Sequence, residues 1–359
     1  LTGFLLLGFA GSIWILFLSR LLDGLSGANI ATAQAVISDS TTEKTRTQGL
    51  GLIGAAFGMG FVVGPVISFI ALSVSKNNFH VPAFIAAGFS AISILLTIFM
   101  LKETLPPESR VRLGSRSELS LSLLLRTIKK PMVGFLLGLI FVQQLAFGGF
   151  QQLLSLFTLN KLGLSASGNA IIFVFVGIVV VAVQGYFIGK WSRRFGEARL
   201  IRFGLVMLMA GLVLTAFTPR IPPPWYSRSE LETQLTAERN LPGETPPTQD
   251  IQIPLPPEDR KGLLGIVWIL IAMVPAAIGG GVLQPSLNSL LTQNVSALEI
   301  GGTLGISAAL LSAANAFAPS LGGVLFQEVS PSAPYIFGAL ILVIIFPFTA
   351  RGLRIKPAK

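Results

Sequence analysis

Residues 49–65 read Gly-Leu-Gly-Leu-Ile-Gly-Ala-Ala-Phe-Gly-Met-Gly-Phe-Val-Val-Gly-Pro, an apolar stretch with a small residue at every second to fourth position. In a lipid bilayer, packing leucine against leucine gains little, so close helix association depends on small residues that let backbones approach. This spacing places glycines on one side of a helix, and Pro65 predicts a kink near its end. The stretch therefore predicts the packing face of a membrane-spanning helix.

A second copy of this pattern lies far along the chain, from Gly302 to Pro319. Gly305 corresponds to Gly51 and Pro319 to Pro65 with the same offset (305 − 51 and 319 − 65). Internal repetition of membrane segments is typical of transporters.

The composition predicts an all-α, polytopic membrane protein, because 52% of the residues are hydrophobic and only 12% are charged. Each apolar run except the first is long enough to cross a bilayer as a helix. We therefore expect ten crossings, the first of them truncated, at 1–10, 13–37, 47–73, 81–101, 132–158, 167–189, 199–218, 263–291, 300–327 and 332–350.

The net charge of +10 is explained better by membrane orientation than by nucleic-acid binding. Lys and Arg are concentrated in loops that fall on one side of the predicted helices, at 38–48, 102–130, 190–202 and 351–359. The positive-inside rule predicts that this side is cytoplasmic, with the C-terminus inside a plasma (inner) membrane. The chain has no cysteine and a single histidine, so we expect no metal site and no cofactor.

The domain organisation follows from the charged segments. We expect an N-terminal bundle at 1–101, a cytoplasmic linker at 102–131, a C-terminal six-helix bundle at 132–350 and a tail at 351–359. A proline-rich insert at 219–262 is expected outside the cell, largely disordered, with one short helix near 229–239. Because paired bundles usually have equal helix numbers, we expect two further helices upstream of Leu1.

The segment Arg20-Leu-Leu-Asp23-Gly24-Leu-Ser-Gly27 resembles the fourth helix of the major facilitator superfamily, and most closely its drug/proton antiporters, tetracycline exporters included. The fifth-helix antiporter motif is matched at Gly51, Gly60, Gly64 and Pro65, and departs at Ser68 and Phe69. The resemblance covers essentially the whole chain. It implies a twelve-helix parent fold and makes these glycines and Pro65 a conformational motif.

A third family signature is matched in its C-terminal copy at Gly189, Arg194 and Gly196. Arg193 stands in the aspartate position of that signature, and Glu197 stands in an arginine position. The resemblance implies that these three matched residues also take part in conformational change.

Arg20 lies within a predicted span, where a charged side chain costs about 2.5–3.5 kcal/mol and is expected to face a partner or a cavity. Asp23, three residues later, is the expected partner, with Gly24, Gly27, Ala31, Gln34 and Ser38 continuing one small, polar stripe. We expect Asp23 to be the proton-linked carboxylate and Arg20 its counter-charge. The alternatives are a buried ion pair that only fixes helix packing and an Arg20 side chain that snorkels outward.

The resemblance implies a central cavity lined by the first, fourth, seventh and tenth helices of the parent fold. Polar and aromatic side chains on these helices are the predicted substrate contacts: Gln34, Gln144, Phe147, Gln151, Gln284 and Asn288. An amide both donates and accepts, which suits varied ligands. The alternative for any one amide is a hydrogen bond between helices.

We therefore expect a secondary active transporter, a monomer that exports a small amphipathic organic compound or drug in exchange for protons by alternating access. A sugar or organic-acid facilitator or symporter, and a truncated remnant that does not transport, are the alternatives. An enzyme is disfavoured because the spans offer Arg20 and Asp23 but no cluster of catalytic residues. No phosphate-binding Gly-x4-Gly-Lys-Ser/Thr motif occurs, so ion-gradient coupling is expected.

Overall fold

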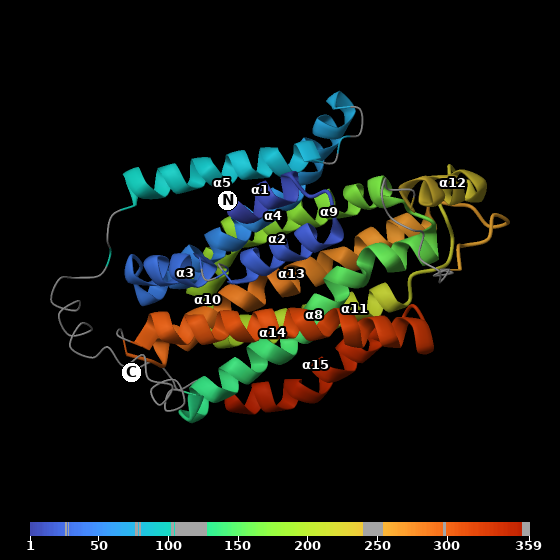
Figure 1. Cartoon of the computed structure of the whole chain (residues 1–359). Coiled ribbons are helices and arrows are strands. Elements are labelled where there is room, and N and C mark those ends of the chain that lie inside the picture. The colour runs from blue at the N-terminus through green and yellow to red at the C-terminus, as the bar shows by residue number, and fades with distance from the viewer. Residues whose placement is uncertain are drawn as a thin grey trace.

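The computed structural model describes residues 1–25, 27, 29–75, 78, 80–101, 104, 128–239, 254–296 and 299–353. Within these residues the regular elements are all helices, which run roughly along one common direction (Figure 1). Nine helical segments of the described chain are long and apolar enough to cross a membrane. They correspond to nine of the ten predicted crossings. The remaining one, predicted at 1–10, contains the seven-residue helix α1, which is too short to be among the nine.

The N-terminal part contains five helices: α1 (Thr2–Gly8), α2 (Ile13–Leu25), α3 (Asn29–Asp39), α4 (Glu43–Val74) and α5 (His80–Met100). The C-terminal part contains α8 (Pro131–Leu162), α9 (Ala166–Val181), the π-helical turn η1 (Ala182–Phe187), α10 (Ile188–Phe195), α11 (Glu197–Ala216), α12 (Arg228–Arg239), α13 (Leu264–Gln293), α14 (Ile300–Glu328) and α15 (Ala333–Gly352). The expected linker, 102–131, falls mostly outside the described residues, as does the tail beyond 353.

The predicted crossing at 13–37 is divided into two helices, which differs from the continuous helix expected. The amide of Gly27 bonds to the carbonyl of Gly24 at 3.3 Å in a turn between α2 and α3. Two glycines so close together lower helix propensity, because glycine loses the most conformational freedom on folding. The Asn29 side chain accepts from the Ile30 amide at 2.9 Å where α3 begins.

The core of the C-terminal part forms where glycines let α11 and α13 touch. A β-carbon at Gly211 would lie 2.5 Å from the Ala276 amide nitrogen, and one at Gly279 would lie 2.5 Å from that of Leu208. Such close approach between backbones is the packing that small residues allow in lipid. Fully buried side chains around it, including Leu205 and Leu212, complete the core.

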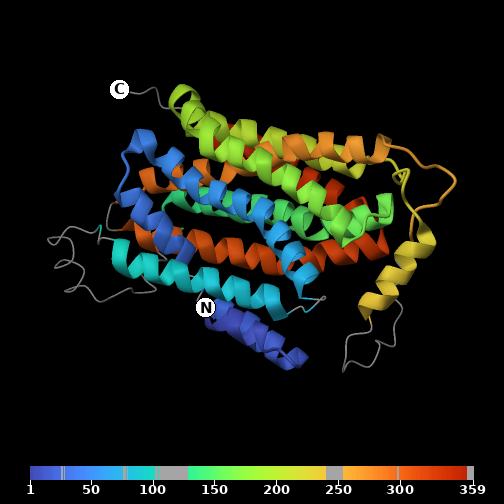
Figure 2. The same cartoon turned by 90° about the horizontal axis from the view of Figure 1, so that it is seen from above.

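The described parts of the 219–262 insert are folded, whereas the sequence predicted a largely disordered segment. The short helix expected near 229–239 is confirmed as α12 (Arg228–Arg239). Beside it, Arg220 donates to the carbonyls of Pro254 and Leu255, each at 2.9 Å, and the Tyr226 hydroxyl donates to Pro256 at 3.1 Å. Figure 2 shows α12 at one end of the molecule, and residues 240–253 lie outside the described residues.

Candidate functional site

The predicted ion pair is present on α2. Nη2 of Arg20 lies 3.0 Å from Oδ2 of Asp23, and the two side chains are 54% and 33% exposed. Arg20 also donates to the Ser19 hydroxyl at 3.0 Å, and this hydroxyl donates to the Gly3 carbonyl at 2.9 Å. The pair is therefore part of a network that joins α2 to α1, and it stays partly accessible.

The polar stripe expected to continue from this pair is divided by the break in the helix. Ala31, Gln34 and Ser38 are buried on α3, and α3 packs against α14 of the C-terminal part. The Ser38 hydroxyl donates to the Gln34 carbonyl at 2.8 Å. Gln34 is thus buried on α3, on a different helix from Asp23.

A group of amide side chains lies between α8 and α14. Gln144 Nε2 donates to Asn315 Oδ1 at 2.9 Å, and Gln143 Nε2 donates to Gln144 Oε1 at 3.3 Å. Gln152 Nε2 lies 3.4 Å from the backbone carbonyl of Asn315, and Gly148 leaves room for the Asn315 side chain. Asn315 and Gln152 are exposed. We call Gln143, Gln144, Gln152 and Asn315 the amide cluster.

The other predicted cavity residues are more enclosed. Phe147 stacks on Phe150 with ring centroids 5.9 Å apart and packs on Gly280 of α13. Asn288 is buried and accepts from the Ser307 hydroxyl at 3.0 Å, while both amide atoms of Gln284 are buried with no hydrogen-bond partner among the described residues. Gln151 is partly buried on α8.

The sequence reasoning missed Asn315 and Gln152. A signal for Asn315 existed, because it lies four residues before Pro319 in the second copy of the opening pattern. A helical proline has no amide hydrogen for the carbonyl four residues earlier, so that carbonyl seeks a donor elsewhere.

The glycine face of α4 packs on the span formed by α9, η1 and α10. A β-carbon at Gly51 would lie 2.9 Å from the Gln184 carbonyl oxygen, and one at Gly177 would lie 2.7 Å from that of Gly58. Gly54 faces the Gln184 side chain in the same contact. The predicted motif residues Gly60 and Gly64 lie elsewhere, with nothing within 4 Å of their β-carbon positions. Pro65 lies within α4, as expected.

Polar side chains join the two halves where α4 begins. The hydroxyls of Thr47 and Ser192 both donate to Glu197 Oε1, at 2.8 and 2.9 Å. Arg193 donates to Gln48 Oε1 at 2.6 Å. Farther round α4, the Arg46 guanidinium donates to the Thr292 hydroxyl at 3.3 Å. We call this group the polar latch: Arg46, Thr47, Gln48, Ser192, Arg193, Glu197 and Thr292.

The third family signature lies beside the polar latch. Gly189 packs on the Gln48 side chain, which leaves no room for a β-carbon there. Gly196 joins α10 to α11 with φ of 75°, a conformation that favours glycine. Arg194 is exposed, with its guanidinium carbon 5.4 Å from the centre of the Phe195 ring. The sequence did not predict Thr47 and Gln48, whose partners lie far away along the chain.

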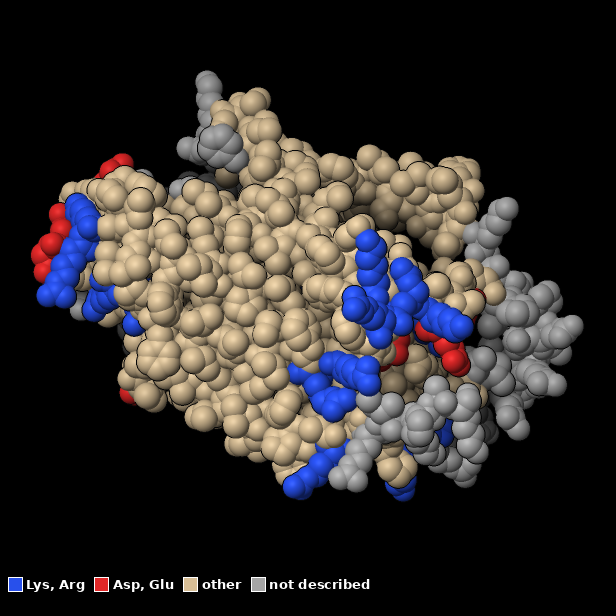
Figure 3. Space-filling model, turned by 180° about the vertical axis from the view of Figure 1, so that it is seen from behind, with Lys and Arg blue, Asp and Glu red and all other residues tan. Residues whose placement is uncertain are grey.

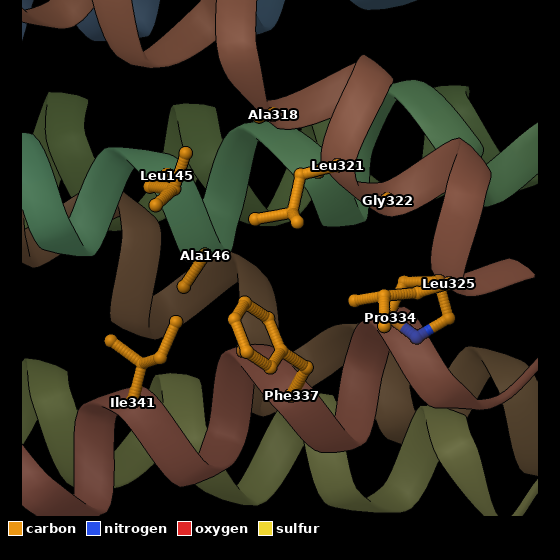
Figure 4. A pocket seen from close by; sticks show the side chains of 11 residues that line it. Leu145, Ala146, Ala318, Leu321, Gly322, Leu325, Pro334, Phe337 and Ile341 are labelled. Carbon is orange, nitrogen blue, oxygen red and sulfur yellow. The ribbon is translucent and has the colours of Figure 1, made fainter. Parts of the chain in front are cut away.

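A hollow between α8, α14 and α15 is lined only by apolar residues, among them Leu145, Leu321 and Phe337 (Figure 4). It offers no polar group that would orient a substrate. The amide cluster and the ion pair are therefore the better candidates for substrate and proton contacts.

Comparison with known proteins decides the family. The model of the Major Facilitator Superfamily matches residues 1–227. The chain belongs to this superfamily. It is 27% identical over 341 residues to multidrug resistance protein 1 of Bacillus subtilis, covering 94% of this chain and 73% of that protein. It is 24% identical over 328 residues to the class B tetracycline resistance protein of Escherichia coli, covering 91% of this chain and 69% of that protein.

The fold of this superfamily member is also that of a solved transporter. The human organic anion transporter MFSD10 superposes with a TM-score of 0.72 at 18% identity, over 97% of this chain and 74% of that one. The predictions of a major facilitator fold and of an integral membrane transporter rather than an enzyme are thus confirmed. The resemblance to drug exporters is confirmed by its relatives.

Proposed function

We propose that this transporter exports small amphipathic organic compounds in exchange for protons. The observation that carries the proposal is the Arg20–Asp23 pair, a carboxylate at 3.0 Å from a guanidinium within a membrane-spanning segment. Ionisable residues inside a membrane usually serve ion pathways or proton relays. The relatives named for multidrug and tetracycline resistance support a drug-like substrate.

The proton step uses the pair as a charge switch. A proton on Asp23 removes the charge that holds Arg20, so the guanidinium is released toward the accessible side of α2. A ligand or proton shifts a conformational equilibrium only by binding one state more tightly than the other. Protonation therefore favours the conformation in which Arg20 has left Asp23.

Alternating access uses the contacts between the halves. Figure 3 shows a larger group of Lys and Arg side chains at one end of the molecule than at the other. Lys190, Arg193, Arg194 and Arg199 contribute to the basic loop beside the polar latch. By the positive-inside rule this end is cytoplasmic. The closed polar latch then corresponds to a state shut toward the cytoplasm. In this proposal the transporter lies in the plasma (inner) membrane with its C-terminus inside, and it works as a monomer.

The amide cluster supports a substrate with both polar and apolar parts. Gln144 and Asn315 present donors and acceptors, and Phe147 lies one turn from Gln144 on α8. Ligand sites commonly combine aromatic surface with a few placed polar groups.

The test is transport by the purified protein in proteoliposomes, with tetracycline and ethidium as separate probes. We expect an imposed pH gradient to drive probe movement and probe addition to move protons in the opposite direction. Asp23→Asn should lower the gradient-driven rate at least tenfold, while the matched control Glu328→Gln, an exposed carboxylate on α14, should leave it unchanged. Proton-coupled transport by Asp23→Asn at the wild-type rate would overturn the assignment of the coupling carboxylate.

A further inference from the structure

Two prolines inside membrane-spanning helices leave backbone carbonyls without their usual partners. Pro285 of α13 has no amide hydrogen for the carbonyl of Gly281, and Pro319 of α14 has none for the carbonyl of Asn315. Within a membrane an unpaired carbonyl is costly, so neighbouring side chains must supply donors.

In both cases a glutamine from a span that packs alongside faces the carbonyl. Gln184 Nε2 donates to the Gly281 carbonyl at 2.8 Å, and Gln152 Nε2 lies 3.4 Å from the Asn315 carbonyl. Gln152 is exposed, so water can replace it. Gln184 is only 6% exposed and Gly281 is buried, so water does not replace the amide at this carbonyl.

Gln184 also lies where the two halves of the transporter meet. It belongs to the π-helical turn η1, a local departure from α-helix that is often found at functional sites. Its Oε1 occupies the space beside Gly54 of α4, and its own carbonyl lies against Gly51. One side chain thus contacts the glycine face of the N-terminal half and the carbonyl freed by Pro285 in the C-terminal half.

We propose that Gln184 is a positioning residue of the transport cycle, which couples the contact between the halves to the Pro285 kink of α13. When α4 packs on η1, the amide is held with Nε2 on the Gly281 carbonyl, and α13 keeps the conformation around Pro285 in which Thr292 meets Arg46 in the polar latch. When α4 moves away, the Gln184 amide is free to turn, and the Gly281 carbonyl loses its fixed donor. This inference rests on the proposed alternating access and is independent of the substrate.

The proposal is tested by a double-mutant cycle with Gln184→Met and Pro285→Ala. Alanine at 285 restores an amide hydrogen to the Gly281 carbonyl, so the donor on Gln184 is no longer needed. The chain has no cysteine, so spin labels at Lys44→Cys and Arg199→Cys report the distance across the latch end without background. Both positions are exposed and lie on opposite halves.

We expect Gln184→Met to lower the population at the short interspin distance at least threefold when residue 285 is proline, and less than 1.5-fold when it is alanine. Any effect of losing the Gln184 oxygen is common to both backgrounds and cancels in the comparison. Pro275→Ala is the matched control, since this proline is in the same helix but does not free the Gly281 carbonyl. It should not rescue Gln184→Met.

Equal effects in both backgrounds would overturn the proposal, and so would rescue by Pro275→Ala. Gln184→Asn, which keeps an amide but is one methylene shorter, provides a second variant if the methionine protein is unstable. A cycle that shows coupling in a protein that moves neither tetracycline nor ethidium would retain this inference and count against the proposed substrates alone.

Discussion

Asp23 Oδ1 occupies the space that a β-carbon at Gly3 would need. The absence of a side chain at Gly3 is therefore what allows the carboxylate to sit against α1 while it faces Arg20. The sequence shows Gly3 and Asp23 twenty residues apart, with no pattern that joins them. Their contact makes α1 part of the environment of the proposed proton site.

Gly3→Ala should displace the Asp23 carboxylate from Arg20, because a methyl group and Oδ1 cannot share the same space. We expect proton-driven transport of tetracycline in proteoliposomes to fall about fivefold, with the protein still folded. Gly88→Ala is the control, since nothing lies within 4 Å of the β-carbon position of this α5 glycine. Wild-type transport by Gly3→Ala would show that the carboxylate position is not limiting.

Gly51→Ala and Gly177→Ala should each separate α4 from its neighbouring span, because the new methyl group meets a backbone carbonyl that cannot turn away. Overpacking of this kind costs about 1–3 kcal/mol. We expect a lower midpoint of thermal unfolding in detergent for both variants.

The matched controls are Gly60→Ala and Gly64→Ala, which lie with Gly51 on α4 but have open space at their β-carbon positions. They should unfold at the wild-type temperature or slightly above it, since alanine is the better helix former. Equal destabilisation by the three motif substitutions, Gly51→Ala, Gly60→Ala and Gly64→Ala, would show that the family motif, rather than the observed contact, governs the packing.

Gln144→Leu and Asn315→Leu should each weaken substrate binding, because either change removes one partner of the bond between Gln144 Nε2 and Asn315 Oδ1. A lost hydrogen bond between membrane helices costs about 0.6 kcal/mol on average, and a directly contacted substrate loses more. We expect KM for tetracycline to rise about three- to tenfold with a smaller change in kcat. A change confined to kcat would argue that the amide cluster acts in conformational change.

Glu299→Gln should destabilise the protein at neutral pH. Hydrogen bonds from Lys130, whose Nζ lies 2.8 Å from Oε2, and from the Ser296 amide lower the pKa of the Glu299 carboxyl to about 2. Because Lys130 is 41% exposed and solvent screens the pair, we expect a contribution of about 1–2 kcal/mol, below the full equivalent of the shift.

The sign of the pH dependence follows from the lowered pKa. The Glu299 contribution is fully present above the usual carboxyl pKa of 4.5 and is lost as the pH falls toward about 2. The difference in unfolding temperature between wild type and Glu299→Gln should therefore shrink between pH 7 and pH 3. Glu230→Gln on α12 is the control, and we expect it to unfold at the wild-type temperature at both pH values. If the difference in unfolding temperature between wild type and Glu299→Gln stayed constant with pH, the ion pair would not be the source of that difference.

Much of the fold was predictable because the bilayer imposes length and apolarity on every crossing. The apolar runs placed the spans within a few residues, and the spacing of Arg20 and Asp23 predicted their pairing on one helix. The break between α2 and α3 was not predicted, although Gly24 and Gly27 mark it, because lone glycines in membrane helices more often serve packing than termination.

The partners of polar groups across helices could not be predicted from sequence. Gln144 was predicted as a cavity residue by its helical position, but Asn315 became its partner through the packing of α14 on α8. Likewise, Gly51 was expected in the motif, while the choice of Gly54 and Gly58 over Gly60 and Gly64 for the contact depends on which side of α4 meets α9.

Hydropathy, repeated glycine patterns and motif residues are local properties, so the sequence was enough to predict a helical membrane transporter of the Major Facilitator Superfamily. Two kinds of pairing became visible only in the folded chain: which glutamine meets a carbonyl freed by a proline, and which side chains of α4 bind α10, α11 and α13. Those pairings depend on the rotation and depth of each helix against its neighbours, which short-range patterns leave open.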